Sequence, residues 1–140
     1  MEENASVQAL VIEPEPEVSA DLANRLTSLG LEVRTVHSHL KGLAVLDDGP
    51  AEIAVVSMDG TDIDGIEFAR LLRRREAESE EQVTYILLLG ENRHRADITE
   101  KGAMVDAFLI RPFLASELSW QIGTALKTIG MLRGLRERLK

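Results

Sequence analysis

The sequence predicts a single α/β domain with a parallel sheet and helices on both of its faces. Short apolar runs alternate five times with amphipathic stretches along the 140 residues. A run such as residues 53–56 contains no polar side chain, which is typical of a strand buried on both faces. Consecutive parallel strands need crossover helices, so the alternation indicates a doubly wound sheet with right-handed crossovers. The length is that of one domain.

The first half of the chain predicts two strands, each followed by a helix. In chain order these elements are residues 7–12, 17–29, 31–36 and 38–46. Pro14 and Pro16 end the first strand, because proline lacks the backbone donor that a strand ladder needs. Gly30 suits the carboxyl cap of the first helix, and Ser38 can cap the second, whose inward face would begin at Leu40. The third element alternates apolar and polar residues, which places it near a sheet edge.

Three more strands and three more helices follow. The strands are expected at residues 53–56, 85–89 and 107–110, and the helices at 66–76, 95–102 and from 114 to the end. The first of these helices would turn Arg70, Arg73 and Arg74 outward to solvent. The last helix would run for about 27 residues, or roughly 40 Å at 1.5 Å per residue, so its final turns should project beyond the sheet.

Charge and composition exclude several classes of function. The chain has no cysteine, which excludes disulfides, thiolate metal sites and thiol chemistry. Its formal net charge of -8 argues against nucleic acid or an anionic membrane as a partner of the whole surface. No apolar run approaches the ~18 residues that a membrane-spanning helix needs, and residues 1–4 lack the layout of a secretory signal. We therefore expect a cytoplasmic protein.

Three segments carry a resemblance that periodicity alone does not supply. They are residues 10–16 (LVIEPEP), residues 58–65, which end in Ile63-Asp64-Gly65, and residues 106–113 (DAFLIRPF). Together they resemble the response-regulator receiver family, the CheY-like domains of two-component signalling. The resemblance implies a flavodoxin-like sheet of order 2-1-3-4-5, with a site at the carboxyl ends of strands one, three and five. It divides the chain into a flexible N-terminus at 1–6, a receiver-like domain at 7–125 and a C-terminal helical extension at 126–140.

The family transfers a phosphoryl group to an aspartate at the tip of the third strand, and this chain departs from that pattern. In the family, an acidic pair after strand one joins that aspartate in holding Mg²⁺, while a hydroxyl and a lysine contact the phosphoryl group. The phosphoacceptor position falls on Ser57, a poor nucleophile with no base beside it. The second acid falls on Pro14, which leaves Glu13, Glu15 and Asp59 as a degenerate acidic pocket. The comparison with the family pattern therefore implies no functional metal, no cofactor and no enzymatic activity.

The positions of the family's switch also differ. The hydroxyl position falls on Leu89 or Gly90, and the ring that partners it matches Phe108, which has no hydroxyl. The lysine position holds Arg111. Because arginine keeps the charge and prefers bidentate carboxylate pairing, we expect an ion pair between Arg111 and Glu13 that closes the pocket. The resemblance also implies that the Arg-Pro bond after Arg111 is cis.

Other ionisable residues favour structural roles. The three carboxylates of residues 59–64 do not fit the frame of a calcium loop, so we interpret them as solvated charges. His37, His39 and His94 show no metal-ligand pattern, and neither metal binding nor catalysis is expected of them. Residues 73–75 are three arginines among glutamates, which indicates a solvated helix face rather than a nucleic-acid site.

The C-terminal helix is the second informative stretch. Ile129, Leu132, Leu135 and Leu139 continue an apolar stripe near coiled-coil spacing, and the basic side chains among them contrast with the acidic body. We interpret this stripe as an interaction helix that forms a homodimer or links to an output domain. The alternative is a frayed tail.

The preferred interpretation is a degenerate receiver, or pseudo-receiver, that acts through protein partners without phosphorylation in bacterial-type signalling. One alternative keeps the phosphorelay, with a kinase modifying Asp59 or another loop carboxylate. A second alternative is a flavodoxin-like module that binds a small anion or cofactor through Arg111, although no glycine-rich phosphate cradle supports it. Binding of nucleic acid or membrane by this domain is not expected.

Overall fold

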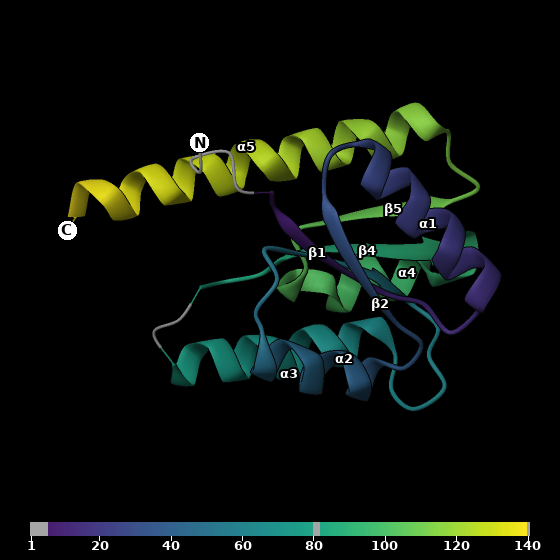
Figure 1. The fold of residues 1–140 in the computed structure, drawn as a ribbon. Helices are drawn as coiled ribbons and strands as arrows, with labels where there is room; N and C mark the ends of the chain where they lie inside the picture. The colour runs from purple at the N-terminus through teal and green to yellow at the C-terminus, as the bar shows by residue number, and fades with distance from the viewer. Residues whose placement is uncertain (1–5, 80–81, 140) are drawn as a thin grey trace.

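The computed structural model describes residues 6–79 and 82–139 and contains one five-stranded parallel sheet (Figure 1). The strand order is β2-β1-β3-β4-β5. The strands are β1 Gln8–Ile12, β2 Glu32–Val36, β3 Ile53–Ser57, β4 Tyr85–Glu91 and β5 Ala107–Arg111. The helices are α1 Pro16–Ser28, α2 His39–Asp48, α3 Gly65–Glu78, α4 Arg95–Lys101 and α5 Ala115–Leu139. The predicted fold class and strand order are confirmed, whereas the flexible N-terminus predicted for residues 1–6 falls outside the described residues except for Ser6.

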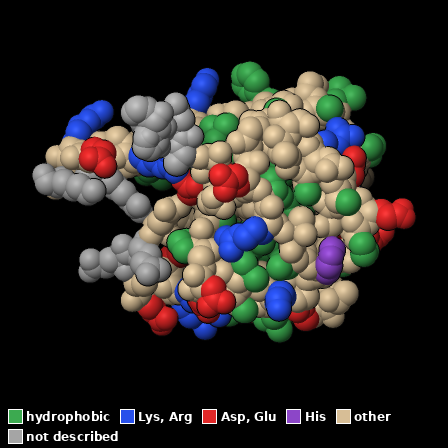
Figure 2. Space-filling model, viewed as in Figure 1, with side chains coloured by type: hydrophobic (Ala, Val, Ile, Leu, Met, Phe, Trp, Pro, Cys, Tyr) green, Lys and Arg blue, Asp and Glu red, His purple; other side chains and the backbone are tan. Residues whose placement is uncertain are grey.

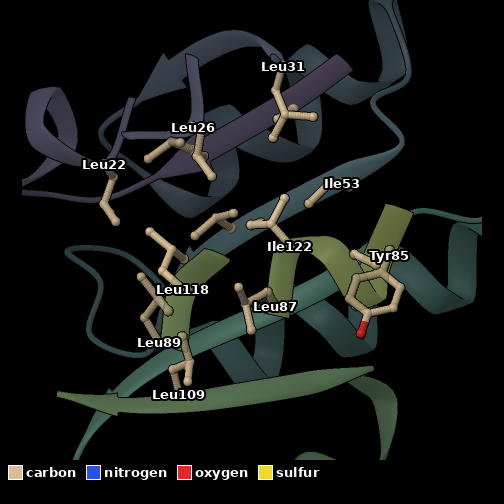
Figure 3. Close-up of a cluster of buried hydrophobic side chains, with 14 of the residues drawn as sticks. Leu22, Leu26, Leu31, Ile53, Tyr85, Leu87, Leu89, Leu109, Leu118 and Ile122 are labelled. Atoms are coloured by element: carbon tan, nitrogen blue, oxygen red, sulfur yellow. The ribbon is translucent and has the colours of Figure 1, made fainter. Parts of the chain in front are cut away.

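The helices form one layer on each face of the sheet, as Figure 1 shows. Helices α1 and α5 cover one face, and α2, α3 and α4 cover the other. Strand residues alternate between the two clusters, so that Val11 faces α1 and α5 while its neighbours Leu10 and Ile12 face the opposite layer. Figure 3 shows the first cluster, which contains Leu22 of α1 and Leu118 of α5. Both faces are therefore buried, as expected for a parallel sheet.

Caps fix where the helices begin and end. The Ser38 hydroxyl accepts a hydrogen bond from the Lys41 amide at 3.1 Å, as predicted. Gly30 has a φ of +94°, a left-handed conformation that favours glycine after a helix end. The predicted inward face of α2 needs a correction, because Leu40 is exposed and the preceding residue, His39, is buried. The reason is the His39 ring, which donates to the Ser57 carbonyl at 2.7 Å and so fixes the rotation of the helix.

Arg73 was predicted to point into solvent, and this is wrong. Its guanidinium donates to the carbonyl oxygens of Met104 at 2.9 Å and Thr84 at 2.8 Å. It also pairs with Asp106 at 2.8 Å and with Glu76 at 2.7 Å. The side chain therefore joins α3 to the segments that lead into β4 and β5, a structural role that periodicity does not reveal.

Helix α5 is docked on the domain at least as far as Ile129. Ile129 is buried in the cluster under α1 and α5, so its assignment to an exposed interaction stripe is wrong. One turn later, Arg133 forms an ion pair with Glu52, the residue before β3. Beyond these contacts Leu135 and Leu139 are exposed, and Figure 2 shows acidic and basic side chains interspersed around this end of the helix. Among the described residues, no helix has the length and apolar character needed to cross a bilayer.

Candidate functional site

The candidate site lies at the carboxyl edge of the sheet. Glu13 follows β1 directly, Ser57 is the last residue of β3, and Arg111 is the last residue of β5. Because all five strands are parallel, these three ends lie at one edge although they are far apart in sequence. This edge is where open α/β sheets place their binding sites.

The centre of the site is a buried network around the Glu13 carboxylate. The Ser57 hydroxyl donates to Oε1 of Glu13. Arg111 Nη2 lies 3.3 Å from the same oxygen and 3.5 Å from the Ser57 hydroxyl. Oε2 accepts from the Glu15 amide at 2.9 Å. The predicted ion pair between Arg111 and Glu13 is therefore present, and both carboxylate oxygens are engaged by protein donors.

This network lines a small cavity of about 130 Å³. Its lining residues are Glu13, Pro14, Glu15, Ser57, Asp59, Leu89, Glu91, His94 and Arg111. Most residues singled out from the sequence are thus brought together. Gly90 and Phe108 are not in the lining, because a side chain at Gly90 would point at Ile98 and Phe108 is exposed beside Gln121 of α5. The peptide bond that follows Arg111 is cis, as the resemblance implied.

His94 is a member of the site that sequence reasoning set aside. Its ring is buried, Nδ1 accepts from the Glu91 amide at 2.8 Å, and Nε2 lies 3.0 Å from Oδ1 of Asp59. A backbone N–H can only donate, so Nδ1 carries no proton and Nε2–H donates to Asp59. The available signal was its place just after a buried strand, but nothing in the sequence connects it with a carboxylate 35 positions away.

The three loop carboxylates are exposed, yet each has a separate structural partner. Asp59 pairs with Arg93 as well as His94, and Asp64 caps α3 by accepting from the Glu67 amide at 2.8 Å. The interpretation of all three as merely solvated charges is therefore corrected. Among the described residues, no group of three or more histidine, aspartate and glutamate side chains has an arrangement that could hold a metal ion.

Asp62 caps α2 from outside that helix. Its carboxylate accepts from the amides of His39 at 3.3 Å and Leu40 at 3.2 Å, and from its neighbour Ile63 at 2.7 Å. Slight desolvation alone would raise the pKa of Asp62, but the backbone hydrogen bonds from Ile63, Leu40 and His39 outweigh it and lower that pKa. The loop after β3 is thereby tied to the start of α2.

A second buried histidine, His39, contacts the backbone at the end of β3. His39 holds the Ser57 carbonyl through Nε2, and its ring meets Phe68 edge-on. Its Nδ1 has no hydrogen-bond partner among the described residues. A Cβ at Gly60 would lie 2.6 Å from that nitrogen and 2.0 Å from the Ile63 carbonyl oxygen, so the loop passes closely over the ring only because position 60 is glycine.

No protein-family model matches the chain. Curated proteins are similar to it over most of its length. It is 32% identical over 118 residues to the transcriptional regulatory protein TcrA of Mycobacterium tuberculosis, a match that covers 81% of this chain and 44% of TcrA. It is 26% identical over 121 residues to the transcriptional regulatory protein CusR of Escherichia coli, covering 86% of this chain and 52% of CusR. The chain therefore spans about half the length of the curated relatives it matches.

Solved structures give the same fold. A response regulator receiver domain protein from Clostridium thermocellum superposes with a TM-score of 0.79 at 19% identity, covering 90% of this chain and 98% of that one. The response regulator TrrA from Thermotoga maritima, solved in complex with Mg²⁺-BeF, gives a TM-score of 0.75 at 21% identity, covering 85% and 98%. These comparisons support a response-regulator receiver (CheY-like) domain. The network of Glu13, Ser57 and Arg111 thus lies at the carboxyl edge of a receiver-like fold.

Proposed function

We propose that this receiver domain is a pseudo-receiver, a non-enzymatic module that acts by protein contact and independently of phosphorylation. The observation that carries the proposal is the closed network at the carboxyl edge. Ser57 stands at the end of β3, where the resemblance implies a phosphoacceptor aspartate, and its hydroxyl is committed to Glu13. The prediction that no base stands beside Ser57 is wrong, because the Glu13 carboxylate accepts from its hydroxyl. A phosphate on serine would nevertheless be an ester and not the labile acyl phosphate that an aspartate forms.

The side chains also fit Mg²⁺ poorly. A hard octahedral cation needs free oxygen ligands, and it takes one or two carboxylates together with water. Glu13 has one oxygen on the Glu15 amide and the other shared by Ser57 and Arg111. Pro14 supplies no side-chain oxygen. A cation beside Glu13 would also stand next to the guanidinium of Arg111, which already neutralises the carboxylate.

A small phosphodonor tests this directly. The full chain is incubated with acetyl phosphate and Mg²⁺, and the intact mass is measured before and after. We expect no added phosphate, while a receiver that retains the acceptor aspartate, treated in parallel, should gain one. If this chain gains a phosphate, the pseudo-receiver proposal is wrong.

The same experiment addresses the alternative of a working phosphorelay. That alternative places the phosphate on an exposed loop carboxylate, and Asp59 is exposed at the rim of the cavity. A phosphate that appears on the wild-type chain and is lost in the Asp59→Asn variant would establish the alternative. The paired arginine and histidine argue against it, because both oxygens of the Asp59 carboxylate are engaged, Oδ2 by Arg93 and Oδ1 by His94.

Contact through the end of α5 is the second part of the proposal. Beyond the docked Ile129, the exposed side chains of Leu132, Leu135 and Leu139 continue the apolar stripe toward the end of the helix. We propose that this stripe pairs with the same stripe of a second copy. The alternative is that this helix leads into an output domain, in line with the transcriptional regulators among the relatives.

The mass of the protein in solution decides between these roles. Sedimentation equilibrium of the full chain should show a monomer–dimer equilibrium, and Leu135→Glu should weaken it by about tenfold or more, since a charge then enters an apolar contact. The matched control is Leu40→Glu on α2, because Leu40 and Leu135 are both 49% exposed. A monomer at all concentrations, or equal effects of the two variants, would contradict pairing through this stripe.

A further inference from the structure

A second and larger hollow lies beside the closed network. It measures about 700 Å³ and is formed by α1, the segment after β4 and the bend after β5. The cavity around Glu13 measures only about 130 Å³. Small-molecule sites in proteins usually span roughly 300–1,000 Å³, so the larger hollow has the volume of a ligand site and the smaller one does not.

One wall of the hollow is apolar and firmly held. Val18 and Leu22 of α1 and Phe113 after β5 line it. All three also pack in or against the core cluster between the sheet and helices α1 and α5. The wall is therefore part of the folded core and offers a preformed surface to an apolar body.

The three guanidinium groups of the charged lining differ in their partners. Arg25 is paired with Asp21 at 2.9 Å, and Arg93 is paired with Glu91 and Asp59. Arg111 bonds only through Nη2, and its partner Glu13 is buried outside the lining of the hollow. Its Nε and Nη1 atoms have no hydrogen-bond partner in residues 6–79 and 82–139, and its side chain is 28% exposed. The N–H groups of these two atoms are free for an acceptor that enters from the hollow.

The carboxylates of the lining restrict which anion is accepted. Asp21 and Glu91 lie in the lining with three arginines, so the net charge around the hollow is small and positive. A dianion such as a phosphate ester would meet repulsion from both carboxylates. A planar monocarboxylate needs one cation and matches the fork of a guanidinium.

We propose that this hollow binds a small amphipathic monocarboxylate, an aromatic or aliphatic body that carries one carboxylate group. The carboxylate takes the free N–H groups of Arg111, and the body lies on Val18, Leu22 and Phe113. The site is separate from phosphoryl chemistry, so it stands or falls independently of whether Ser57 or Asp59 accepts phosphate. Because the same guanidinium also pairs with Glu13, the bound carboxylate and the Glu13 carboxylate share the positive charge of Arg111.

The experiment is a titration of the full chain followed by the backbone amide resonances in NMR. The probes are phenylpropionate and phenylpropanol, which share an apolar body and differ in the carboxylate. We expect phenylpropionate to shift the amides of Val18, Leu22 and Phe113 in a saturable way, with a Kd about tenfold lower than that of the alcohol, because a charge-assisted pair adds to the apolar contact. Equal affinities, shifts confined to the end of α5, or no saturation by either probe would overturn the proposal.

Three variants test which residues contribute to the binding of the two probes. Arg111→Met should reduce the affinity for phenylpropionate to that of the alcohol. Val18→Trp fills the hollow, keeps Arg111 and should abolish binding of both probes, which preserves the test if the loss of Arg111 prevents folding. Arg138→Met removes an exposed arginine distant from the hollow and should bind as the wild type does. Wild-type affinity in Val18→Trp, or in a folded Arg111→Met, contradicts the proposal.

Discussion

Each end of the sheet buries one glutamate and pairs it with an arginine from the C-terminal part of the chain. At the carboxyl end Glu13 is 5% exposed and pairs with Arg111. At the amino end Glu52 is 8% exposed and pairs with Arg133. The two pairs differ in what else surrounds them. The pair of Glu13 and Arg111 belongs to a closed polar network, whereas the pair of Glu52 and Arg133 holds helix α5 against the domain.

At the carboxyl end all donors come from strand ends or the residues that follow them, and the Arg111 side chain is mostly enclosed. At the amino end Glu52 accepts from the Gln8 amide at 2.8 Å, while its cation belongs to a helix and is 54% exposed. Water screens a half-exposed cation, so the second pair is worth less, and its main effect is to hold α5 along the domain. The following predictions test this contrast, from the largest effect to the smallest.

The largest effect is expected for Arg111→Met, which leaves the buried Glu13 charge without its partner. Breaking a buried pair from one side costs about 3 kcal/mol, and we expect a loss of this size in the free energy of unfolding measured by urea denaturation. The double variant Glu13→Gln, Arg111→Met should recover much of the loss, because the uncompensated charge is then gone. A single variant as stable as the wild type would show that the network at this end is not closed.

A smaller effect is expected at the amino end. Glu52→Gln keeps an acceptor for Gln8 but removes the charge that holds Arg133, and we expect a loss of about 1 kcal/mol in the free energy of unfolding. Hydrogen exchange should become faster in residues 130–139 and remain unchanged in β1 and β3. Arg138→Met is the matched control. Unchanged exchange in the end of α5 would mean that Ile129 alone holds the helix.

The third effect concerns a carboxylate that pairs with backbone amides instead of a cation. Asp62→Ala removes the acceptor for two amides at the start of α2, and we expect a loss of about 1 kcal/mol, as for other helix caps. The folded-state pKa of Asp62 lies below its ordinary value of 3.8, so its contribution is present above that pH and is lost as pH falls through the folded pKa. Urea denaturation at neutral pH and well below pH 3.8 should show the difference from the wild type shrinking in acid.

The smallest effect is expected for Asp59→Asn. Asp59 and Arg93 are 59% and 62% exposed, and an exposed pair contributes no more than about 0.5 kcal/mol. The variant therefore serves as the surface reference for the two buried pairs. A loss as large as that of Arg111→Met would reverse the contrast and place the main network of this edge at Asp59.

Much of the fold was predictable because buried parallel strands leave few alternatives. A run such as residues 53–56 has no polar side chain to place in solvent, so its burial on both faces follows from the residues alone. Hydrophobic periodicity does not show which strands are neighbours in a sheet. The strand order was therefore predicted from the resemblance. The predicted end of β4 was two residues short, since Gly90 and Glu91 read as loop residues although they continue the ladder beside β5.

The contact within the site that the sequence predicted is an ion pair between two positions of the family pattern. A carboxylate at Glu13 and a guanidinium at Arg111 predict their own pairing, and the structure contains it. His94 was missed because its partner is defined by the fold and not by neighbouring residues. Ile129 was misassigned because an apolar stripe does not show where a core ends and an exposed surface begins, a boundary that depends on how far the sheet extends beneath the helix.

The distance along the chain between Glu13 and Arg111 has a consequence for biosynthesis. The two residues are 98 positions apart, and they meet only after the fifth strand has been made. At a synthesis rate of about 5–20 residues per second, a ribosome needs roughly 5 to 20 s to travel from one codon to the other. During that interval the nascent chain carries Glu13 without Arg111, so this ion pair can form only after the last strand of the sheet has been synthesised.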